Sequence, residues 1–468
     1  MSAMLADRAR DRIQRWEPQR LVLILACIGS FSVIMDATIV SVTLPDLRAD
    51  LGFTPAALPW AVNAYTLAFA GCLLFGGRCA DVFGRRRIMF VGMGIFTVAR
   101  VAVGLADSPA FLLTARAVQG LGGALLMPVT LSMLTTAFVE PAARARALAL
   151  WSAVGAAGAA SGPVVGGLLT ELAGWRWVFF VLAPLGVIGM VGAILVLPPQ
   201  VSAAPRMRLD IVGALLVTAG ITGVVLAIMR SAAVGWTDSG VLGALLGGFA
   251  LLGIFGIHQT YWAADPILPF DVFRIRSVSS ANAVMFLVGA GFLASPVLLA
   301  LYLQDVHGFS PLLAGVGYLP VGVAMTAGSR SAGWLTVRLG VRTATVLCCA
   351  VSATGLAGTA ICIALDASYF WTVLICGAIL GYGTAAAFTP ITVAATNGVP
   401  PDRNGLAAGV LNTVRQTSGA VGLAALSAIA LSAGYAPSFA TCALCLTAAG
   451  LVALVTMPRD RSERGLAQ

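Results

Sequence analysis

Apolar stretches of about twenty residues recur along almost the whole chain, and they constrain its fold more than any other feature. A helix of that length crosses a hydrocarbon core of roughly 30 Å, and it satisfies its backbone polar groups within one segment. Hydrophobic residues make up 59% and charged residues 10% of the 468 positions, which excludes a soluble domain. The sequence therefore predicts an all-α polytopic membrane protein.

We expect fourteen transmembrane (TM) helices, near residues 20–42, 58–77, 88–106, 110–133, 147–170, 177–197, 211–230, 241–262, 281–303, 312–330, 343–364, 369–392, 405–431 and 438–457. An even number returns both termini to one side of the membrane. No small-residue cleavage site follows the first apolar core, so we expect the first span to be retained.

Arginine supplies every basic side chain, and its distribution predicts the orientation. The two tails and alternate loops hold 22 arginines, whereas the opposite loops hold only Arg48, Arg176 and Arg230. This positive-inside bias predicts that both termini are cytoplasmic and that the protein lies in the cytoplasmic (inner) membrane. Orientation and contact with anionic lipid headgroups account for the net charge of +9, so no nucleic-acid partner is expected.

An internal repeat predicts the domain organisation. Segments 77–86 and 333–342, after the second and tenth spans, each have Gly, a second Gly seven residues later, and Arg two residues further on. A Gly-x-Gly pair followed by Pro occurs at 120–128 and again at 381–390, and helix starts follow Pro141 and Pro401. We therefore predict parallel six-helix bundles. The expected boundaries are 1–19 (cytoplasmic tail), 20–197 (N-terminal bundle), 198–280 (linker with two additional helices), 281–457 (C-terminal bundle) and 458–468 (cytoplasmic tail).

Five motifs follow one another along the first half of the chain. They are Asp36-Ala37-Thr38-Ile39-Val40 with Leu44-Pro45, Gly77 to Arg87, Arg116-Ala117-Val118-Gln119-Gly120, Gly158 with Gly162-Pro163 and Gly166-Gly167, and Trp175 to Phe180 with Pro184. In this order they resemble motifs of the major facilitator superfamily, and within it of the fourteen-spanner drug:proton antiporters. Ser41, Val82 and Leu182 depart from those motifs. The resemblance implies two six-helix bundles with two inserted central helices.

Asp36 is the carboxylate that lies well inside an expected span, and Arg116 lies at a similar depth. Burial favours the neutral form of a carboxyl group and a nearby guanidinium favours its ionised form, which is what a reversible proton site requires. We predict that Asp36 and Arg116 couple transport to protons. The alternatives are a permanent structural ion pair for Asp36 and a snorkelling side chain for Arg116.

The segment with Gly77, Asp81, Gly84, Arg85 and Arg86 is expected to be a short cytoplasmic loop. We predict that Asp81 accepts from the N-terminus of the thirteenth span, near Asn404 and Gly405, and so latches an outward-facing state. The alternative is a solvated charge cluster that only sets the topology.

The resemblance makes Gly158, Gly162, Pro163, Gly166 and Gly167 an antiporter motif. We expect it to form a bend that seals the cavity against proton leak, and generic tight packing is the alternative.

Other polar residues within the spans have less definite roles. Arg100 belongs to none of the motifs, and a snorkelling or lipid-facing position is as compatible with the sequence as a functional one. Asn412, Arg415 and Gln416 form a polar patch in the thirteenth span that lines a substrate cavity or ties helices together.

The remaining candidates for site chemistry are interpreted as structural. His258 and His307 are expected at helix ends at the membrane interface, and the CxxC of Cys442 and Cys445 is expected to pack. We predict no metal site, no cofactor and no enzymatic centre.

The leading functional hypothesis is a proton-coupled antiporter that exports small lipophilic compounds, such as drugs, antibiotics or toxic organic cations, by alternating access. A narrow-specificity exporter of an endogenous metabolite or antibiotic, a solute:proton symporter and a non-transporting membrane scaffold or sensor are the alternatives. The expected partners are a small-molecule substrate, protons and membrane lipids. The sequence indicates neither the substrate nor the oligomeric state.

Overall fold

The structure is a computed structural model that describes residues 18–198, 209–400 and 403–458. The first part of the chain forms α2 (Pro18–Ile39), η1 (Val40–Val42), α3 (Leu44–Leu51), α4 (Trp60–Phe83), α5 (Arg85–Gly104), α6 (Pro109–Ala137), α7 (Pro141–Ala173), α8 (Trp175–Phe180) and α9 (Ala183–Val196). The middle part forms α10 (Ile211–Val234), α11 (Ser239–Ile257), η2 (His258–Trp262) and η3 (Phe270–Arg274). The last part forms α12 (Arg276–Phe292), α13 (Ser295–Asp305), α14 (Pro311–Gly317), α15 (Leu319–Leu339), α16 (Val341–Ala364), η4 (Phe370–Ile375), α17 (Cys376–Thr396), α18 (Asn404–Ala433) and α19 (Tyr435–Thr456).

Within these residues, 14 helical segments are long and apolar enough to cross a membrane, which confirms the predicted number. Several spans consist of two helices rather than one. Pro184, Pro296 and Pro320 stand at the start of the second helix in the sixth, ninth and tenth spans. Because proline has no backbone N–H, it interrupts the helical hydrogen bonds at these points.

The segments expected as loops after the second and tenth spans are instead almost entirely helical, so this part of the prediction is wrong. Gly77 and Asp81 lie in α4, Arg85 begins α5, and the single residue Gly84 separates the two helices. Gly84 has φ 85°, and its counterpart Gly340 between α15 and α16 has φ 79°. Only glycine adopts such values without strain, so one residue is sufficient for the turn.

The repeated Gly-x-Gly pairs, at positions 120–122 and 381–383, lie at equivalent helix contacts in the two halves. A Cβ on Gly122 of α6 would lie 2.7 Å from the backbone nitrogen of Phe96 in α5, and a Cβ on Gly383 of α17 would lie 2.6 Å from that of Ser352 in α16. Close backbone approach at small residues is a usual way for membrane helices to associate. In each half, a glycine therefore lets the fourth transmembrane helix pack closely on the third.

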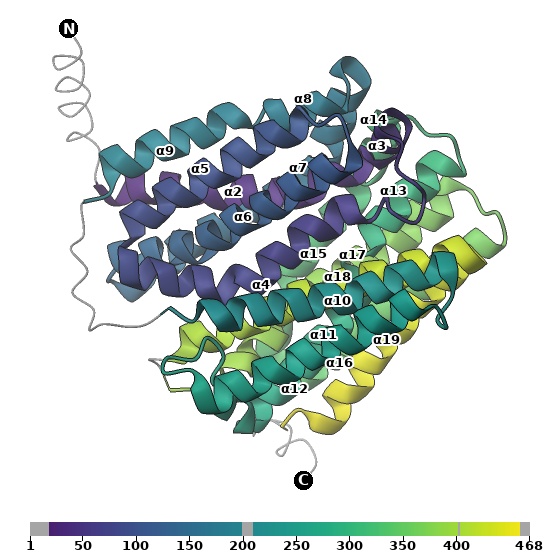
Figure 1. Ribbon diagram of the computed structural model, residues 1–468. Coiled ribbons are helices and arrows are strands. Elements are labelled where there is room, and N and C mark those ends of the chain that lie inside the picture. The colour runs from purple at the N-terminus through teal and green to yellow at the C-terminus, as the bar shows by residue number, and fades with distance from the viewer. Residues whose placement is uncertain (1–17, 199–208, 401–402, 459–468) are drawn as a thin grey trace, which may run out of the picture.

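The two additional helices lie against one side of the molecule, where the halves meet. In Figure 1, α10 and α11 (teal) run beside each other across α4 of the first half and α18 of the second. Ile221 and Val225 of α10 share a hydrophobic cluster with Ala420 and Ala424 of α18. The helix α10 therefore bridges the halves by apolar contact. Residues 199–208, part of the predicted linker, lie outside the described residues.

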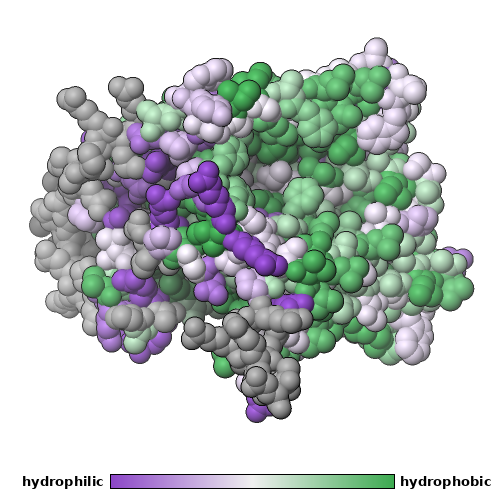
Figure 2. Space-filling model, turned by 90° about the horizontal axis from the view of Figure 1, so that it is seen from below, coloured by the Kyte–Doolittle hydropathy of each residue, from purple (hydrophilic) through white to green (hydrophobic). Residues whose placement is uncertain are grey.

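The two ends of the helix bundle differ in polarity. Figure 2 shows hydrophilic residues gathered at one end, on the left, and a broad hydrophobic face beside them. We call the opposite end, which holds α3, α8 and α14 and lies towards the right in Figure 1, the α3 end. The end with the Gly84 and Gly340 turns is called the Gly84 end.

Candidate functional site

Asp36 lies at the centre of a buried polar cluster in the first half of the chain. Its Oδ2 accepts from Nη1 of Arg116 at 2.6 Å, and its Oδ1 accepts from Nη2 of Arg100 at 3.1 Å. The same Oδ1 accepts from Nε2 of Gln119 at 2.7 Å. We call these four residues the Asp36 cluster. The structure thus brings together the predicted pair, Asp36 and Arg116, and adds two residues to it.

Helix packing fixes both guanidinium groups. Arg100, on α5, also donates to the carbonyls of Leu182 at 3.2 Å and Ser32 at 3.1 Å. Arg116, on α6, donates through Nε to the carbonyl of Ala61 at 3.0 Å. Arg100 and Arg116 are each 0% exposed, so of the two alternatives for Arg100 the snorkelling or lipid-facing one is wrong.

Aromatic rings complete the walls of the cluster. The guanidinium of Arg100 lies 4.6 Å from the ring centroid of Phe96, and that of Arg116 lies 4.6 Å from the ring centroid of Tyr65. Such contacts stabilise a desolvated cation. Both arginines are therefore held on fixed faces of α5 and α6, beside the carboxylate.

The cluster carries more positive than negative charge. Two guanidiniums face one carboxylate, and Asp36 is itself 0% exposed. Nη2 of Arg116 is buried without a hydrogen-bond partner among the described residues. Removing one member of a buried ion pair costs about 3–5 kcal/mol, so such an arrangement depends strongly on its single carboxylate.

Every contact to the Asp36 oxygens comes from a donor, which is the geometry of an ionised carboxylate. Oδ1 accepts from Arg100 and Gln119, whereas Oδ2 accepts from Arg116 alone. Two guanidiniums and one amide thus stabilise the charge of this carboxylate through charge-assisted hydrogen bonds.

Two features of the sequence indicate that Arg100 and Gln119 belong to a polar cluster. An arginine in the middle of an apolar span is costly in lipid and indicates a partner. Gln119 follows Arg116 by three residues, which places both on one face of α6, and its Oε1 accepts from Nη1 of Arg116 at 2.9 Å. Their common partner on α2 is not encoded in any local spacing.

The halves are tied together at the α3 end. Arg48 of α3 and Asp305 of α13 form an ion pair of 2.9 Å. Nε2 of Gln304 donates to the carbonyl of Val42 at 3.2 Å, and the backbone N–H of Leu312 donates to Glu171 at 3.3 Å. The hydrogen bonds that we find between described residues of α2–α9 and of α12–α19 all lie here. The structure is therefore closed at the α3 end.

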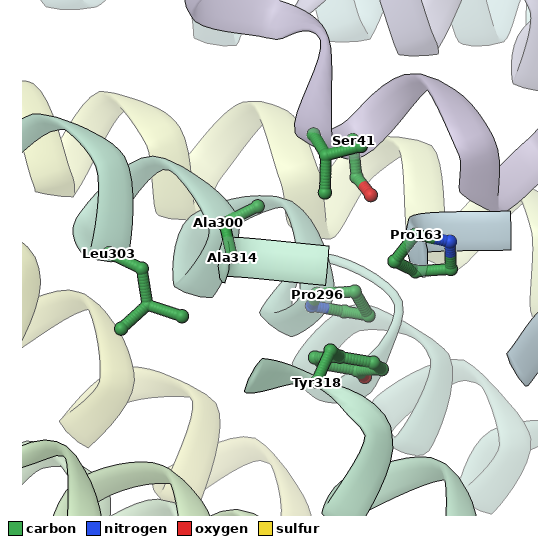
Figure 3. A pocket seen from close by; sticks show the side chains of 8 residues that line it. Ser41, Pro163, Pro296, Ala300, Leu303, Ala314 and Tyr318 are labelled. Atoms are coloured by element: carbon green, nitrogen blue, oxygen red, sulfur yellow. The ribbon is translucent and has the colours of Figure 1, made fainter. Parts of the chain in front are cut away.

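Figure 3 shows the residues that line a small cavity between the two halves near this closure. Ser41 of η1 and Pro163 of α7 face Pro296 and Tyr318 from the other half around a small cavity. The cavity measures about 10 Å³, close to the volume that holds one water molecule. A solute of drug size does not pass through it.

The antiporter motif of α7 makes two kinds of contact. Gly158, Gly162 and Gly166 pack against α2, where a Cβ on Gly166 would lie 2.6 Å from the carbonyl of Ile39. Gly167 instead lies against the carbonyl of Pro311 in the other half. The tight-packing interpretation thus describes the first three glycines, and Gly167 belongs to the closure at the α3 end. The predicted bend stays a prediction.

A counterpart of Gly167 lies on the facing helix. Gly315 of α14 lies against the carbonyl of Pro163, and a side chain there would collide with backbone. We expect Gly315→Val to open the α3 end, because the closed packing has no room for the added carbons. Spin labels at Ala49 and Val306 in a cysteine-free background would move further apart. Gly243→Val, where a Cβ meets open space, is the matched control; an unchanged distance in Gly315→Val would contradict this role.

Asp81 is exposed and lies near the end of α4. It forms no hydrogen bond with α18 among the described residues, and a Cβ on Gly405 would meet open space. The side chain of Asn404 lies outside the described residues. No contact of the predicted latch between Asp81 and α18 is found among the described residues, and its role in the outward-facing state stays a prediction.

The predicted polar patch of α18 is present. Nη2 of Arg415 donates to Oδ1 of Asn412 at 2.6 Å, and the guanidinium lies 5.5 Å from the ring centroid of Phe388 in α17. Gln416 is half-buried beside them. The patch belongs to the second half of the chain, and no hydrogen bond or ion pair between described residues joins it to the Asp36 cluster.

His258 has a more specific environment than the predicted interfacial one. Its Nε2 lies 2.8 Å from Oδ1 of Asp210, which also caps α10 by accepting from the N–H of Gly213 at 2.8 Å. Burial alone would raise the pKa of Asp210, but hydrogen bonds from Gln259, Gly213 and His258 lower it. This group ties the end of α11 to the start of α10.

No group of three potential metal ligands occurs among the described residues. All nine cysteines are unpaired thiols, including Cys442 and Cys445.

Comparison with known proteins identifies relatives of the whole chain. The sequence profile of the Major Facilitator Superfamily matches residues 26–423 and 283–467. A cephamycin export protein of Amycolatopsis lactamdurans is 38% identical over 91% of this chain and 88% of its own length. A puromycin resistance protein of Streptomyces alboniger is 36% identical over 89% and 83%. A tetracenomycin C resistance and export protein of Streptomyces glaucescens is 30% identical over 88% and 76%.

Proposed function

Because this chain belongs to the major facilitator superfamily, we propose that it exports small lipophilic compounds, antibiotics among them, from the cell in exchange for protons. It is a multi-pass membrane transporter, and its relatives include antibiotic export and resistance proteins. The observation that carries the proton coupling is the Asp36 cluster. A single buried carboxylate there exchanges guanidinium contacts for a proton.

The arginine distribution supports the orientation that we propose. The Gly84 end holds the clustered arginines of segment 78–87 and those at 338 and 342, so it faces the cytoplasm by the positive-inside bias. The α3 end then faces outward. Because the α3 end is closed, we assign the structure to the inward-facing state of an alternating-access cycle, in which the central site is reached from the cytoplasm.

In this cycle the inward-facing state has released its proton. Asp36 is ionised and held by Arg100 and Arg116, and the substrate binds from the cytoplasm. Opening of the α3 end separates the halves and moves Asp36 within reach of external protons. Proton uptake displaces a guanidinium, the substrate leaves, and the protonated transporter returns.

The proton gradient supplies the energy, and the transport step uses no cofactor and no enzymatic chemistry. One charge that crosses 100 mV is worth about 2.3 kcal/mol, which sustains a concentration ratio of roughly fifty-fold. Exchange of one proton for a monovalent cation is electroneutral and draws only on the pH difference. Protons and membrane lipids are the remaining partners.

A narrow-specificity exporter of an endogenous antibiotic is the second candidate. The observation that favours it is that a relative of 38% identity is a cephamycin export protein. A susceptibility profile of a host that lacks its own pumps, with and without this chain, separates narrow from broad specificity.

Everted membrane vesicles from such a host test the function itself. We expect an acid interior to drive accumulation of lipophilic fluorescent compounds into the vesicles, by about tenfold per pH unit for electroneutral exchange of one proton. Collapse of the pH gradient with nigericin should release them. Accumulation that ignores both the pH gradient and the membrane potential would contradict proton coupling.

A further inference from the structure

The charges inside the membrane indicate which substrates this transporter accepts. Asp36 is the acidic residue that lies inside a described span away from its ends, whereas Asp81, Glu171 and Asp305 lie within two residues of helix ends. Both oxygens of Asp36 are already occupied by guanidinium and amide donors. In this inward-facing state the described spans therefore offer no free carboxylate to a cationic compound.

Arg415 is a cation in the middle of a span without an acidic partner among the described residues. It lies ten residues after Gly405 in α18, about 15 Å along the helix axis. One of its five N–H donors binds Asn412 at 2.6 Å. An arginine at this depth normally has a counter-charge, and the described protein supplies none.

The neighbours of Arg415 suit an aromatic or lipophilic acid. Its guanidinium lies 5.5 Å from the ring centroid of Phe388, whose ring packs edge-on against Phe292 at 6.2 Å between centroids. Guanidinium groups bind planar carboxylates through two parallel hydrogen bonds and stack on aromatic faces. Asn412 already orients one end of the group.

We propose that the exported compounds are lipophilic monoanions whose acidic group binds Arg415. This deepens the export function proposed above and rests on it. The anion supplies the missing counter-charge of Arg415, while its apolar part lies against Phe388 and Phe292. Asn412 acts as a positioning residue for the guanidinium.

Proton and anion occupy different halves of the molecule, so they do not compete for one site. Asp36 and its arginines lie on α2, α5 and α6, whereas Arg415 lies on α18. Outward movement of a monoanion and inward movement of a proton together carry two positive charges inward. A potential of 100 mV then contributes about fifty-fold for each charge to the sustainable gradient, whereas exchange for a monocation gains nothing from it.

Binding of three dyes with one fluorophore tests the assignment: dansyl-phenylalanine (anion), dansyl-phenylalanine amide (neutral) and dansylcadaverine (cation). We expect the purified protein in nanodiscs to bind the acid about tenfold or more tightly than the amide. Arg415→Gln should weaken binding of the acid by about ten- to a hundredfold and leave the amide unchanged. Arg415→Lys should retain part of the preference. Arg338→Gln, at an exposed arginine over Trp334, is the matched control.

Three results would overturn the proposal: tighter binding of the amide or the cation, an unaltered preference in Arg415→Gln, or no saturable binding of the acid. Size-exclusion profiles show whether each variant is folded, and Arg415→Lys keeps the test valid if Arg415→Gln is not. Proton-driven accumulation of the amide or the cation would refute the anion assignment and leave the export function intact. Loss of all proton-driven accumulation would instead refute the export function.

Discussion

Asp36→Asn should abolish uphill export while the protein still binds its substrate. An amide neither takes up nor releases a proton at physiological pH, so a pH gradient has no site on which to act. In everted vesicles the wild type should concentrate its substrate about tenfold per pH unit if one proton is exchanged for each substrate molecule. The variant should bring the substrate only to equal concentrations on both sides.

The amide also leaves Arg100 and Arg116 without an anion, at a cost of about 3–5 kcal/mol to folding. Asp36→Glu is therefore measured beside Asp36→Asn, because the longer carboxylate keeps the charge and should keep part of the uphill transport. Monodisperse elution of both variants establishes that they fold. Full accumulation by Asp36→Asn would refute the coupling role of this residue.

Arg100→Gln has the second large expected effect. Two guanidiniums hold Asp36 in its ionised form, and removal of one lets the carboxylate take up a proton more readily. The pH profile of substrate exchange should therefore move to higher pH than that of the wild type. The measurement is the initial rate of substrate uptake into everted vesicles as a function of luminal pH.

Arg230→Gln serves as the control for Arg100→Gln. Arg230 is exposed and pairs at 3.4 Å with Asp238, at the link between α10 and α11. Its loss should leave the pH profile in place. If Arg100→Gln only lowers the rate at every pH, then Arg100 is a structural residue and the two-guanidinium account is wrong.

The course of the helices was predictable because apolar length alone determines where a membrane is crossed. The number of spans follows from it. Helix ends were less predictable. Residues of segment 77–83 are compatible with a helix, and only the positive φ of Gly84 shows where α4 stops.

The sequence was sufficient to predict a buried carboxylate paired with an arginine, but it was not sufficient to predict every residue of the site. An intramembrane aspartate and arginine each require a partner, which was enough to pair Asp36 with Arg116. That Arg100 and Gln119 share this carboxylate depends on how α2, α5 and α6 converge. Convergence of three helices is set by packing of the whole bundle, which no local spacing encodes.

The closure at the α3 end shows the same limit. Four glycines of α7 belong to one motif in the sequence, yet three pack on α2 and Gly167 packs on α14 of the other half. In the sequence, a glycine indicates only that another part of the chain can approach the helix closely at that position. Which backbone approaches is a property of the closed conformation, and it differs within one short segment.

Proton movement coupled to substrate tests the central claim most directly. The purified protein is reconstituted into liposomes that contain a pH-sensitive dye, and a transported substrate is then added outside. We predict that the wild type makes the lumen more alkaline as substrate enters and protons leave, and that Asp36→Asn gives no pH change. Substrate entry by the wild type without a proton signal, or an undiminished signal from Asp36→Asn, would contradict proton exchange at Asp36.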